Sequence, residues 1–368
     1  MFICIAGKNN IAVDILKYLI ENNYDRHEIG VVCNRTENGK NTWQKSLRLF
    51  AREHEIKEYS LDEIYRIENM VFLSLEFNQI VKPERFSSAR LYNIHFSLLP
   101  KYRGMFTSAL PILHGEKETG VTLHRIDSGI DTGEIIAQKK FYIRDTDTAR
   151  DLYFKYIYFG TLLVKENIKM ILDGKESSVP QEETEASYYS KHAIDYTNIC
   201  IELDKRAIDI KNQIRAFNFR EYQIPEVYGE KIIDTRITNI LSSEKAGMRL
   251  FEDNAAIVMA SLDYDIILYK DRLDELMTAC RKGDLKKVQE ISLVKRHVDQ
   301  QDGDGNTPLI VASQHNNVDI VKCLVVQGAD VHIKNYEGKG ALECANEVYL
   351  RTGDARIKNL LMKFGVKN

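Results

Sequence analysis

The chain has 368 residues, 44% of them hydrophobic and 29% charged, and its formal net charge at pH 7 is −3. This length leaves room for two or three globular domains, and the near balance of charge gives no reason to expect binding to long nucleic acids, which requires clustered lysine and arginine. No apolar run approaches the roughly 18 residues of a membrane span, and the six cysteines lack the paired spacing of a metal site. We therefore expect a cytoplasmic protein that binds no metal, no membrane and no nucleic acid.

The first part of the chain alternates buried strands with amphipathic helices. Strands are predicted over residues 2–6, 29–33 and 70–75, and helices over residues 11–22 and 43–54. This order of strands and helices produces a parallel sheet, so we predict a Rossmann-like α/β domain with a mostly parallel sheet. The turn after the first strand lacks the glycine spacing of a dinucleotide fingerprint, which argues against a nicotinamide cofactor.

Residues 93–104, Asn-Ile-His-Phe-Ser-Leu-Leu-Pro-Lys-Tyr-Arg-Gly, carry the first reactive motif. On a strand, alternation places Asn93 and His95 on one side if Ile94 faces the core, near the strand end where open α/β sheets bind ligands. A glycine-bounded loop at residues 127–133, Asp-Ser-Gly-Ile-Asp-Thr-Gly, adds carboxylates. An amide, an imidazole and a carboxylate together suit acyl transfer to an amine, because they can stabilise an oxyanion and take a proton from the attacking nitrogen.

Other hydrolytic motifs are absent from the sequence. There is no Gly-x-Ser-x-Gly elbow, and no cysteine stands in a recognisable nucleophile motif with a histidine. His114 and His124 lack the motif context of His95, so we expect both to be structural.

The two stretches together resemble the signature of the formyltransferases that use 10-formyltetrahydrofolate, which is Asn-x-His, Ser-Leu-Leu-Pro-x-x-Arg-Gly and Asp-x-Gly-x-Asp-Thr-Gly. Every letter of it is met here, and the resemblance extends over roughly the first 230 residues. It implies an enzyme that uses 10-formyltetrahydrofolate as co-substrate. It also implies that Asn93, His95 and Asp131 form the catalytic triad.

The resemblance suggests further contacts for the two substrates. In that family the loop after the third of these strands helps bind the pteridine through main-chain groups, which makes Phe77 and Asn78 candidates. The turn after the first strand carries Lys8 and Asn9, which either face the second substrate or lie in solvent. Arg103 and Asp127 are further candidates for contacts to the folate.

The rest of the first domain is predicted to hold a helix at residues 106–114, strands at 120–126 and 134–142, and a long helix over 148–172. A polar stretch with turn-forming residues at 173–190 then connects to the next region.

An aromatic passage, Phe-Asn-Phe-Arg-Glu-Tyr-Gln-Ile-Pro at residues 217–225, follows a predicted helix at 207–217 and precedes short strands at 226–233. A ring can stack on a base and a cation can hold a pyrophosphate, although the phenylalanines could equally belong to the core. The candidates for contacts to a nucleotide are Lys191, Arg215, Phe217 and Tyr222.

This passage looks like that of the enzymes that formylate amino groups on nucleotide-linked dideoxy sugars. Those enzymes make N-formylated sugars for bacterial surface polysaccharide, including O-antigen, and pair as dimers through their β regions. Methionyl-tRNA formyltransferase instead carries a larger basic barrel, and the glycinamide ribonucleotide enzyme stops near the end of its catalytic domain. Neither description suits this chain.

From residue 271 onward the sequence repeats with a period of 33 residues. Leu-Met-Thr-Ala-Cys at residue 276 aligns with Leu-Ile-Val-Ala-Ser at 309 and with Leu-Glu-Cys-Ala-Asn at 342. This is the ankyrin pattern of a β-turn and two helices, with an insertion of four residues predicted around residues 351–354. Ankyrin units usually bind proteins. The alternative is that their loops, with Lys334, Tyr336 and Lys339, bind the nucleotide sugar.

We thus predict a formyltransferase domain at residues 1–190, a small helix and β-strand region at 191–270 for nucleotide contacts and dimerisation, and an all-α ankyrin domain at 271–368. The expected reaction transfers the formyl group of 10-formyltetrahydrofolate to a dTDP-linked 3- or 4-amino-dideoxyhexose in a homodimer. Three alternatives remain: another amine, such as methionyl-tRNA or a glycinamide; hydrolysis to formate; and an ankyrin adaptor with an inert enzyme domain.

Overall fold

A computed structural model describes residues 1–365 and separates into two compact units. Unit 1 consists of Met1–Ile199 and Arg215–Gln223, and unit 2 consists of Cys200–Ile214 and the chain from Ile224 onward. Unit 2 thus holds both the small sheet and the repeats, which the sequence divided at residue 270. Because each unit has a hydrophobic core of its own, each is described by itself.

Unit 1 is built on a seven-stranded sheet with the order β3-β2-β1-β4-β5-β7-β8. The first five strands in this order are parallel, whereas β7 pairs antiparallel with β5 and β8 pairs antiparallel with β7. The mostly parallel Rossmann-like sheet predicted from the sequence is therefore confirmed. The strands are β1 (Phe2–Gly7), β2 (Ile29–Cys33), β3 (Lys57–Glu58), β4 (Met70–Leu75), β5 (Leu91–His95), β7 (Glu118–Arg125) and β8 (Ile135–Tyr142), and a separate pair is formed by β6 (Arg103–Gly104) and β9 (Tyr188–Tyr189).

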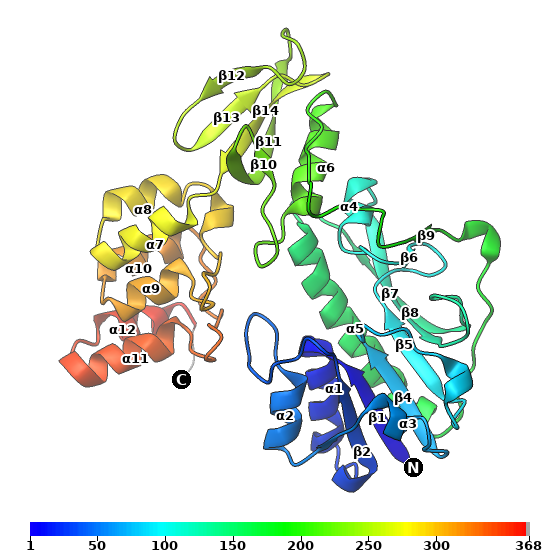
Figure 1. Cartoon of the computed structure of the whole chain (residues 1–368). Helices are drawn as coiled ribbons and strands as arrows, with labels where there is room; N and C mark the ends of the chain where they lie inside the picture. The colour runs from blue at the N-terminus through cyan, green and yellow to red at the C-terminus, as the bar shows by residue number, and fades with distance from the viewer. Residues whose placement is uncertain (366–368) are drawn as a thin grey trace. The chain divides into compact units, whose positions relative to one another are not determined.

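One face of this sheet is covered by the long helix α5, as Figure 1 shows, together with α1. Ile5, Leu73 and Ile94 belong to the core cluster that packs on these helices, whereas Cys4 and Phe72 belong to a smaller cluster. Since neighbouring strand residues point to opposite faces, the side chains on either side of Ile94 are directed away from the main core. The helices of unit 1 are α1 (Asn9–Glu21), α2 (Leu47–Glu53), α3 (Leu61–Ile64), α4 (Leu110–Leu113) and α5 (Ala149–Leu172).

Two of these helices are shorter than the sequence predicted, and local geometry explains both differences. The side chain of Ser46 accepts a hydrogen bond from the amide of Leu49, so α2 begins after a cap that the periodicity did not reveal. Phe106 has a φ of 62°, which no right-handed helix tolerates, so α4 begins only at Leu110. By contrast α5 begins where predicted, at a capping box formed by Thr148.

Unit 2 contains a five-stranded antiparallel sheet with the order β10-β11-β14-β13-β12. Its longest strand, β11, has 12 residues and extends well beyond the short strands that the sequence predicted. Helix α6 (Ala207–Phe217) matches its predicted bounds; it begins in unit 2 and its last residues belong to unit 1. The strands are β10 (Glu226–Val227), β11 (Glu230–Leu241), β12 (Arg249–Glu252), β13 (Ala256–Met259) and β14 (Tyr264–Lys270).

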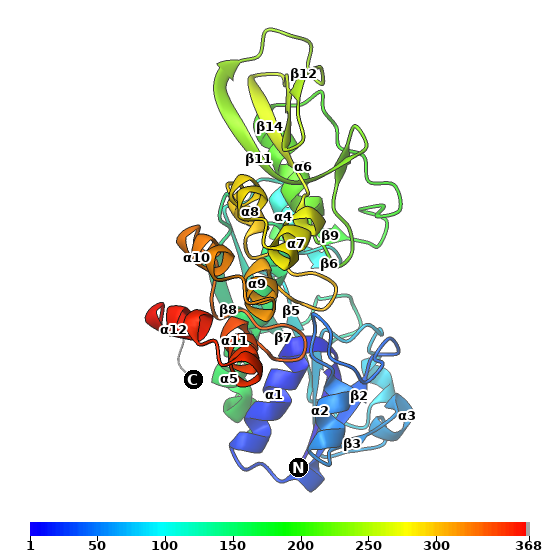
Figure 2. The ribbon, with the colours of Figure 1, turned by 90° about the vertical axis from the view of Figure 1, so that its left-hand side faces the viewer.

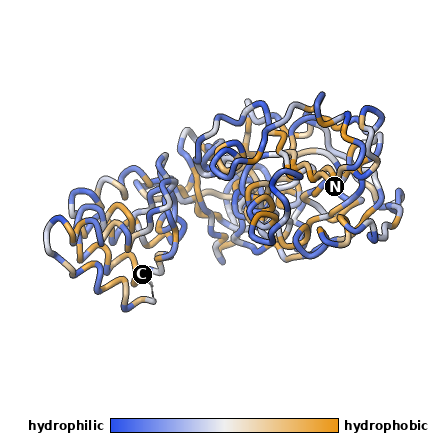
Figure 3. Tube along the Cα trace, turned by 90° about the horizontal axis from the view of Figure 1, so that it is seen from below, coloured by the Kyte–Doolittle hydropathy of each residue, from blue (hydrophilic) through white to orange (hydrophobic). Residues whose placement is uncertain are grey.

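The repeats form three helix pairs stacked in two layers, with α7, α9 and α11 in one layer and α8, α10 and α12 in the other (Figures 1 and 2). Hydrophobic and hydrophilic stretches alternate along these helices (Figure 3). Leu276, Leu309 and Leu342, at the same position of the period, are all buried. The helices are α7 (Leu273–Lys282), α8 (Leu285–Ile291), α9 (Pro308–Gln314), α10 (Val318–Val326), α11 (Ala341–Thr352) and α12 (Arg356–Lys363).

Two details distinguish the third repeat. Helix α11 has 12 residues against seven in α9, so much of the predicted insertion lengthens a helix before Gly353 ends it in a left-handed conformation. The turn of the third repeat, which carries Tyr336, packs on the turn of the second repeat, which carries Gly305. A Cβ built on Gly305 would lie 2.5 Å from the ring of Tyr336. Gly305 has a φ of +80°, so glycine is favoured there for both its conformation and its lack of a side chain.

Within residues 1–365, no helix combines the length and the apolar character that crossing a membrane requires. In the same part of the chain, no group of three or more histidine, cysteine, aspartate or glutamate side chains is arranged so that it could hold a metal ion.

Candidate active site

Strand β5 positions the first two site residues. Asn93 lies opposite His124 of β7 in the antiparallel register, and His95 lies opposite Thr122. Ile94 packs into the core between them, so the amide and the imidazole project from the other face of the sheet. The side chain of His95 is buried, with 8% of its surface exposed, and that of Asp131 is nearly so, at 13%. The sequence motifs are thus brought together in space.

Both ring nitrogens of His95 face oxygen atoms. Nε2 lies 2.8 Å from the main-chain oxygen of Tyr102, and Nδ1 lies 3.3 Å from Oδ2 of Asp131. The carbonyl oxygen and the carboxylate can both only accept, and the contact to the carbonyl is the shorter one, so we place the proton of the neutral ring on Nε2; Nδ1, beside the carboxylate, is the nitrogen that gains a second proton. Burial lowers the pKa of His95, and the charge of Asp131 opposes that effect.

Asp131 is held by groups from three segments of unit 1. Its Oδ2 accepts a hydrogen bond of 2.9 Å from the main-chain N–H of Gly104, and its Oδ1 lies 3.4 Å from Nδ2 of Asn93. Burial would raise the pKa of this carboxyl group, but the charges and hydrogen bonds of His95, His124 and Gly104 outweigh it and hold the pKa well below its usual range. The carboxylate therefore stays ionised within this group of polar side chains.

His124 is a member of this group that the sequence did not single out. Its Nε2 lies 3.1 Å from Nδ2 of Asn93 and 3.5 Å from Oδ1 of Asp131, and its Nδ1 lies 2.7 Å from the main-chain oxygen of Arg125. From the sequence we expected His124 to be a structural residue outside the group of catalytic side chains. The signal that could have found it is the pairing of β5 with β7, which places it beside Asn93 and which sequence periodicity does not supply. His114, by contrast, contacts the hydroxyl of Tyr102 at 3.0 Å.

Two side chains that were predicted to contact the folate, those of Arg103 and Asp127, hold the loops of the site. The guanidinium of Arg103 donates to Glu183 Oε1 at 2.7 Å and to Gln181 Oε1 at 2.8 Å, and Gln181 in turn donates to the main-chain oxygen of Asp131. Oδ1 of Asp127 accepts a hydrogen bond of 2.7 Å from the hydroxyl of Thr132. The side chains of Arg103 and Asp127 are thus engaged with the chain itself, where they fix the position of Asp131.

The other two predicted folate contacts follow β4. Phe77 is half-buried against Phe72, with ring centroids 6.4 Å apart, so its side chain supports the loop. The main-chain N–H of Asn78 donates to Oδ1 of Asn34 at 3.1 Å, and its side chain is exposed. The neighbouring Ile80 is 75% exposed, which leaves an apolar side chain on this loop.

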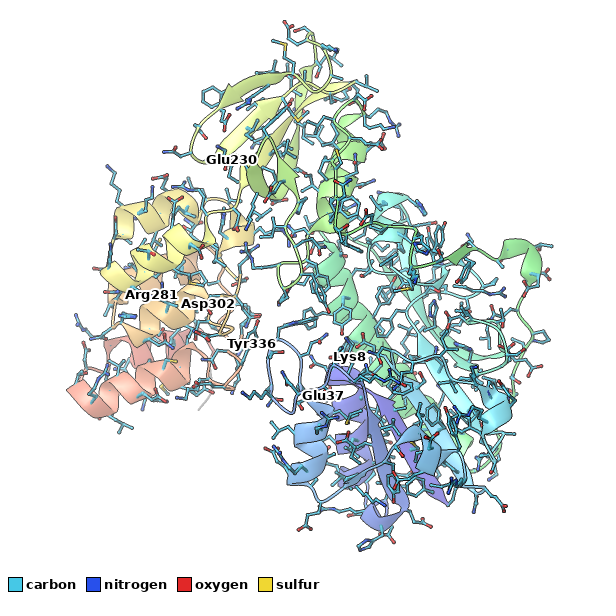
Figure 4. All side chains as sticks on the ribbon, in the orientation of Figure 1. Lys8, Glu37, Glu230, Arg281, Asp302 and Tyr336 are labelled. Carbon is cyan, nitrogen blue, oxygen red and sulfur yellow. The ribbon has the colours of Figure 1, made fainter. Side chains whose placement is uncertain are left out.

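A polar cluster lies at the ends of β1 and β4. Asn9 is buried and donates to Oε2 of Glu76 at 3.0 Å and to the hydroxyl of Tyr153 at 3.0 Å. Burial raises the pKa of Glu76, although the hydrogen bonds from Asn9 and Tyr153 oppose the rise. Asn9 therefore does not lie in a solvated turn. Lys8, labelled in Figure 4, directly precedes it and is half-buried.

An aromatic cluster, which we call the Trp43 cluster, borders these polar groups. The ring of Trp43 lies 5.7 Å from that of Tyr153, 5.4 Å from that of Phe219 and 5.6 Å from that of Tyr222, each in an edge-on arrangement. Phe219 is buried, whereas Tyr222 is 62% exposed. The sequence analysis did not single out Trp43, which it placed at the start of a predicted helix, and it weighed Phe219 only as a possible core residue.

The remaining predicted nucleotide contacts lie elsewhere. Arg215 is buried and donates to the main-chain oxygens of Arg144 and Asp147, so its guanidinium holds a loop of the chain. Phe217 packs against the core, as the alternative interpretation held. Lys191 is exposed and leaves its charge available to solvent.

Comparisons with known proteins match this geometry. The formyl transferase family matches residues 1–161, and a family of three ankyrin repeats matches residues 276–361. One similar solved structure is that of WlaRD, a sugar 3N-formyl transferase crystallised in the presence of dTDP and 5-N-formyl-THF. Its sequence is 46% identical to this chain, and the two structures align with a TM-score of 0.69 over 73% of this chain and 97% of that one. The chain belongs to the formyl transferase family. The family predicted from the two motifs is therefore confirmed, as is the ankyrin module.

Two further relatives show the breadth of the family. An N-formyltransferase from Helicobacter canadensis, in complex with folinic acid and dTDP-3-aminofucose, is 44% identical, with a TM-score of 0.70 over 74% of this chain and all of that one. A methionyl-tRNA formyltransferase of Clostridioides difficile (strain 630) is 29% identical over 284 residues, which cover 70% of this chain and 91% of that protein. This formyltransferase thus has a markedly higher identity to the two sugar enzymes.

Proposed function

We propose that this formyltransferase transfers the formyl group of 10-formyltetrahydrofolate to the 3-amino group of a dTDP-linked 3-amino-dideoxyhexose. The observation that carries the proposal is the meeting of Asn93, His95 and Asp131 in one buried polar group. The choice of acceptor is supported by the 44–46% identity to enzymes crystallised with dTDP or dTDP-3-aminofucose and with a formylated folate. Of the two positions that the sequence left open, we therefore favour the 3-amino isomer.

The triad supplies what the transfer of a formyl group needs. The neutral amine attacks the formyl carbon, and an N–H of Asn93 stabilises the negative charge that develops on the formyl oxygen. The amine then gives up one proton, which we assign to Nδ1 of His95 because Nε2 is committed to Tyr102. Asp131 stabilises the resulting imidazolium. The bond from carbon to N10 breaks, N10 takes up the proton, and the products are the formamide and tetrahydrofolate.

The folate is proposed to bind against the loop that follows β4. The main-chain N–H of Asn78 is bonded to Asn34, so the main-chain carbonyl groups of Phe77 and Asn78 are the ones proposed for a pteridine, and exposed Ile80 adds apolar surface. Arg103 and Asp127 contribute indirectly, through the loops that they hold. The test is a fluorescence titration with 5-formyltetrahydrofolate, in which Ile80→Asp is expected to weaken binding and Arg66→Ala, a surface change outside this loop, is not.

The nucleotide sugar is proposed to bind at the Trp43 cluster. Tyr222 offers an exposed ring on which a base can stack, and Trp43 and Phe219 hold that ring in place. Asn9 and Glu76 lie beside the cluster, at the ends of parallel strands, where they can meet hydroxyl groups of a hexose. Lys8 and Lys191 are the cations proposed for the pyrophosphate.

The finer biological context is also a proposal. The small sheet of unit 2 exposes several apolar side chains, and we propose that it forms the interface of a homodimer. We further propose that the enzyme works in the cytoplasm, where it makes an N-formylated sugar for O-antigen. Sedimentation of the wild type and of Phe251→Asp tests the dimer, since a charge on this exposed residue should shift the dimer towards monomer. The apolar residues concerned are Ile240, Leu241, Leu250, Phe251 and Leu262.

For the ankyrin module we propose a protein partner, as is usual for these repeats. Binding of the nucleotide sugar by its loops is the alternative, for which Lys334, Tyr336 and Lys339 are the candidate contacts. Calorimetry on the full chain separates the two, because one dTDP bound per chain favours the protein partner and two favour the nucleotide.

The proposed reaction is tested with one formyl donor and a panel of amines. Formyl transfer is measured by mass spectrometry with dTDP-3-amino and dTDP-4-amino sugars, methionyl-tRNA and glycinamide ribonucleotide, together with formate release in the absence of any amine. We expect the highest kcat/KM with the 3-amino sugar. Preference for an amine outside the sugars, or formate release alone, would overturn the proposal.

A further inference from the structure

The main-chain carbonyl of Tyr102 holds one edge of the His95 ring. Its oxygen lies 2.8 Å from Nε2, and Oδ2 of Asp131 lies 3.3 Å from Nδ1. A carbonyl oxygen only accepts, so this contact is a hydrogen bond whenever Nε2 carries a proton, and the imidazolium formed in the reaction donates to both oxygens. Burial lowers the pKa of His95, whereas Asp131 and this carbonyl raise it. The carbonyl therefore orients the ring and stabilises its charged form.

The turn that begins at Tyr102 serves both members of the His95–Asp131 pair. Two residues after the carbonyl, the main-chain N–H of Gly104 donates to Oδ2 of Asp131 at 2.9 Å. Tyr102 itself has a φ of 60°, in the left-handed region that a residue with a side chain rarely adopts. A backbone in this conformation needs support from the surrounding structure. The contacts that fix Tyr102 in its left-handed conformation thus also fix the groups that hold the pair.

The buried side chain of Tyr102 supplies that support. Its hydroxyl donates to Oε1 of Glu116 at 2.9 Å and lies 3.0 Å from Nδ1 of His114. Because the single proton of the hydroxyl goes to the carboxylate, Nδ1 of His114 is the donor in the second contact. The ring also stacks on that of Tyr189, with centroids 5.5 Å apart and planes 17° apart, and the main-chain N–H donates to the hydroxyl of Ser187. His114, expected from the sequence to be structural, is thus one of the anchors of this turn.

We propose that Tyr102 is a positioning residue for formyl transfer, whose anchored side chain holds the carbonyl that accepts a hydrogen bond from Nε2 of His95. The inference rests on the proposed function and adds a contact that the sequence motif leaves unspecified. In this role Tyr102 touches neither substrate. If its anchor is lost, the turn relaxes towards ordinary backbone conformations and the carbonyl moves away from Nε2. The ring is then less often in the orientation that accepts the proton of the amine.

Removal of one hydroxyl tests the anchor. Tyr102→Phe keeps the ring and its stacking but loses both hydrogen bonds of the hydroxyl, and we expect kcat to fall roughly fivefold while KM for each substrate stays within about twofold. Tyr92→Phe is the matched control, because Tyr92 is buried in the same unit and its hydroxyl also donates to a glutamate, Glu176, at 2.6 Å. The kcat of this control should stay within about twofold of the wild type. An unchanged kcat in Tyr102→Phe, or an equal loss in Tyr92→Phe, would overturn the proposal.

The same anchor is tested from its other end at Glu116, which lies partly at the surface. Glu116→Leu removes the acceptor of the hydroxyl and should lower kcat in the same way, whereas Glu116→Gln keeps an oxygen at that place and should stay within about twofold of the wild type. If both residues act through one hydrogen bond, the loss in the Tyr102→Phe, Glu116→Leu double variant should be smaller than the product of the separate losses. Losses that multiply would show that the proposed anchor is wrong. Thermal unfolding of each variant checks that the rates refer to folded enzyme.

A measurement independent of turnover completes the test. In NMR spectra of the 15N-histidine-labelled full chain, His95 is assigned by its absence in His95→Asn. Its Nε2–H proton should be observed in the wild type and in Tyr92→Phe, because the hydrogen bond slows exchange with water, and should exchange faster in Tyr102→Phe. Equal exchange in the two tyrosine variants would refute the role of Tyr102 regardless of kcat. Failure of the wild type to formylate any nucleotide amino sugar would instead count against the proposed function, so the two failures are distinguishable.

Discussion

The site beside β5 and the ankyrin repeats depend on different kinds of buried side chain. At the site, Asn93 and Asp131 come from distant segments, and their polar atoms are satisfied by one another and by main-chain groups. In the repeats, Leu276, Leu309 and Leu342 recur every 33 residues and are buried among apolar neighbours. The difference teaches that the site depends on buried polar groups that bond to one another, whereas the recurring positions of a repeat need only apolar burial between neighbours.

The strongest test of this contrast is His95→Asn. The change keeps a polar side chain of similar size but removes the nitrogen that takes the proton, so kcat should fall roughly one hundredfold or more. The melting temperature should stay close to that of the wild type. A rate within about threefold of the wild type would show that His95 is not a reactive group.

The counterpart in the repeats is Leu309→Ala. Leu309 is buried, and its truncation should lower the free energy of unfolding by about 2–5 kcal/mol through lost burial and a cavity. Chemical denaturation measures this loss, and kcat per folded molecule should not change. Leu293→Ala is the control, because Leu293 is 72% exposed and should cost little. A large fall in kcat would mean that the repeats take part in turnover.

The Trp43 cluster lies between the two extremes, since it is apolar yet proposed to bind substrate. Tyr222→Ala should raise KM for the nucleotide sugar roughly tenfold, in line with about 1–3 kcal/mol for stacking on a base, and leave KM for the folate unchanged. Tyr158→Ala provides a matched loss of an exposed ring, because Tyr158 is 60% exposed. Equal effects of the two changes on KM would remove Tyr222 from the nucleotide site.

Within the repeats, Gly305→Ala tests how much the packing between neighbouring turns contributes to stability. Gly305 and Gly338 both have a φ of +80°, so alanine at either costs about 1–2 kcal/mol in backbone strain. Only at Gly305 would the new methyl group also press on Tyr336, whereas nothing lies within 4 Å at Gly338. Gly305→Ala should therefore lower the denaturation midpoint more than Gly338→Ala. The reverse order would show that the turns do not support each other.

The smallest expected effect concerns pH. Neutral His95 takes the proton, so activity is lost as pH falls through its pKa, which burial lowers and Asp131 raises. Asp131→Asn removes the raising charge and should move the acid limb of kcat/KM to lower pH, besides reducing the rate. Asp62→Asn, a surface change, should leave the limb in place. A shift of the limb to higher pH would contradict the arrangement of charges.

Much of the fold followed from the sequence because its signals are local. The strands at 29–33 and 70–75 and the helix α6 were predicted to the residue from runs of apolar side chains. The two motifs predicted Asn93, His95 and Asp131, and the period of 33 residues predicted the helix pairs, because each repeat buries the same positions.

Only the tertiary structure determined which residues contact one another. The sequence does not say that β7 pairs with β5, and that pairing alone brings His124 to Asn93. Nor does it say that Trp43 meets Tyr222, since the two are far apart in the chain and share no period. It also left Arg215 open as a phosphate contact, whereas the folded chain commits this guanidinium to main-chain oxygens. Periodicity determines which face of an element is buried, but the partners of a polar side chain are chosen by strand order and loop packing, which depend on the whole chain at once.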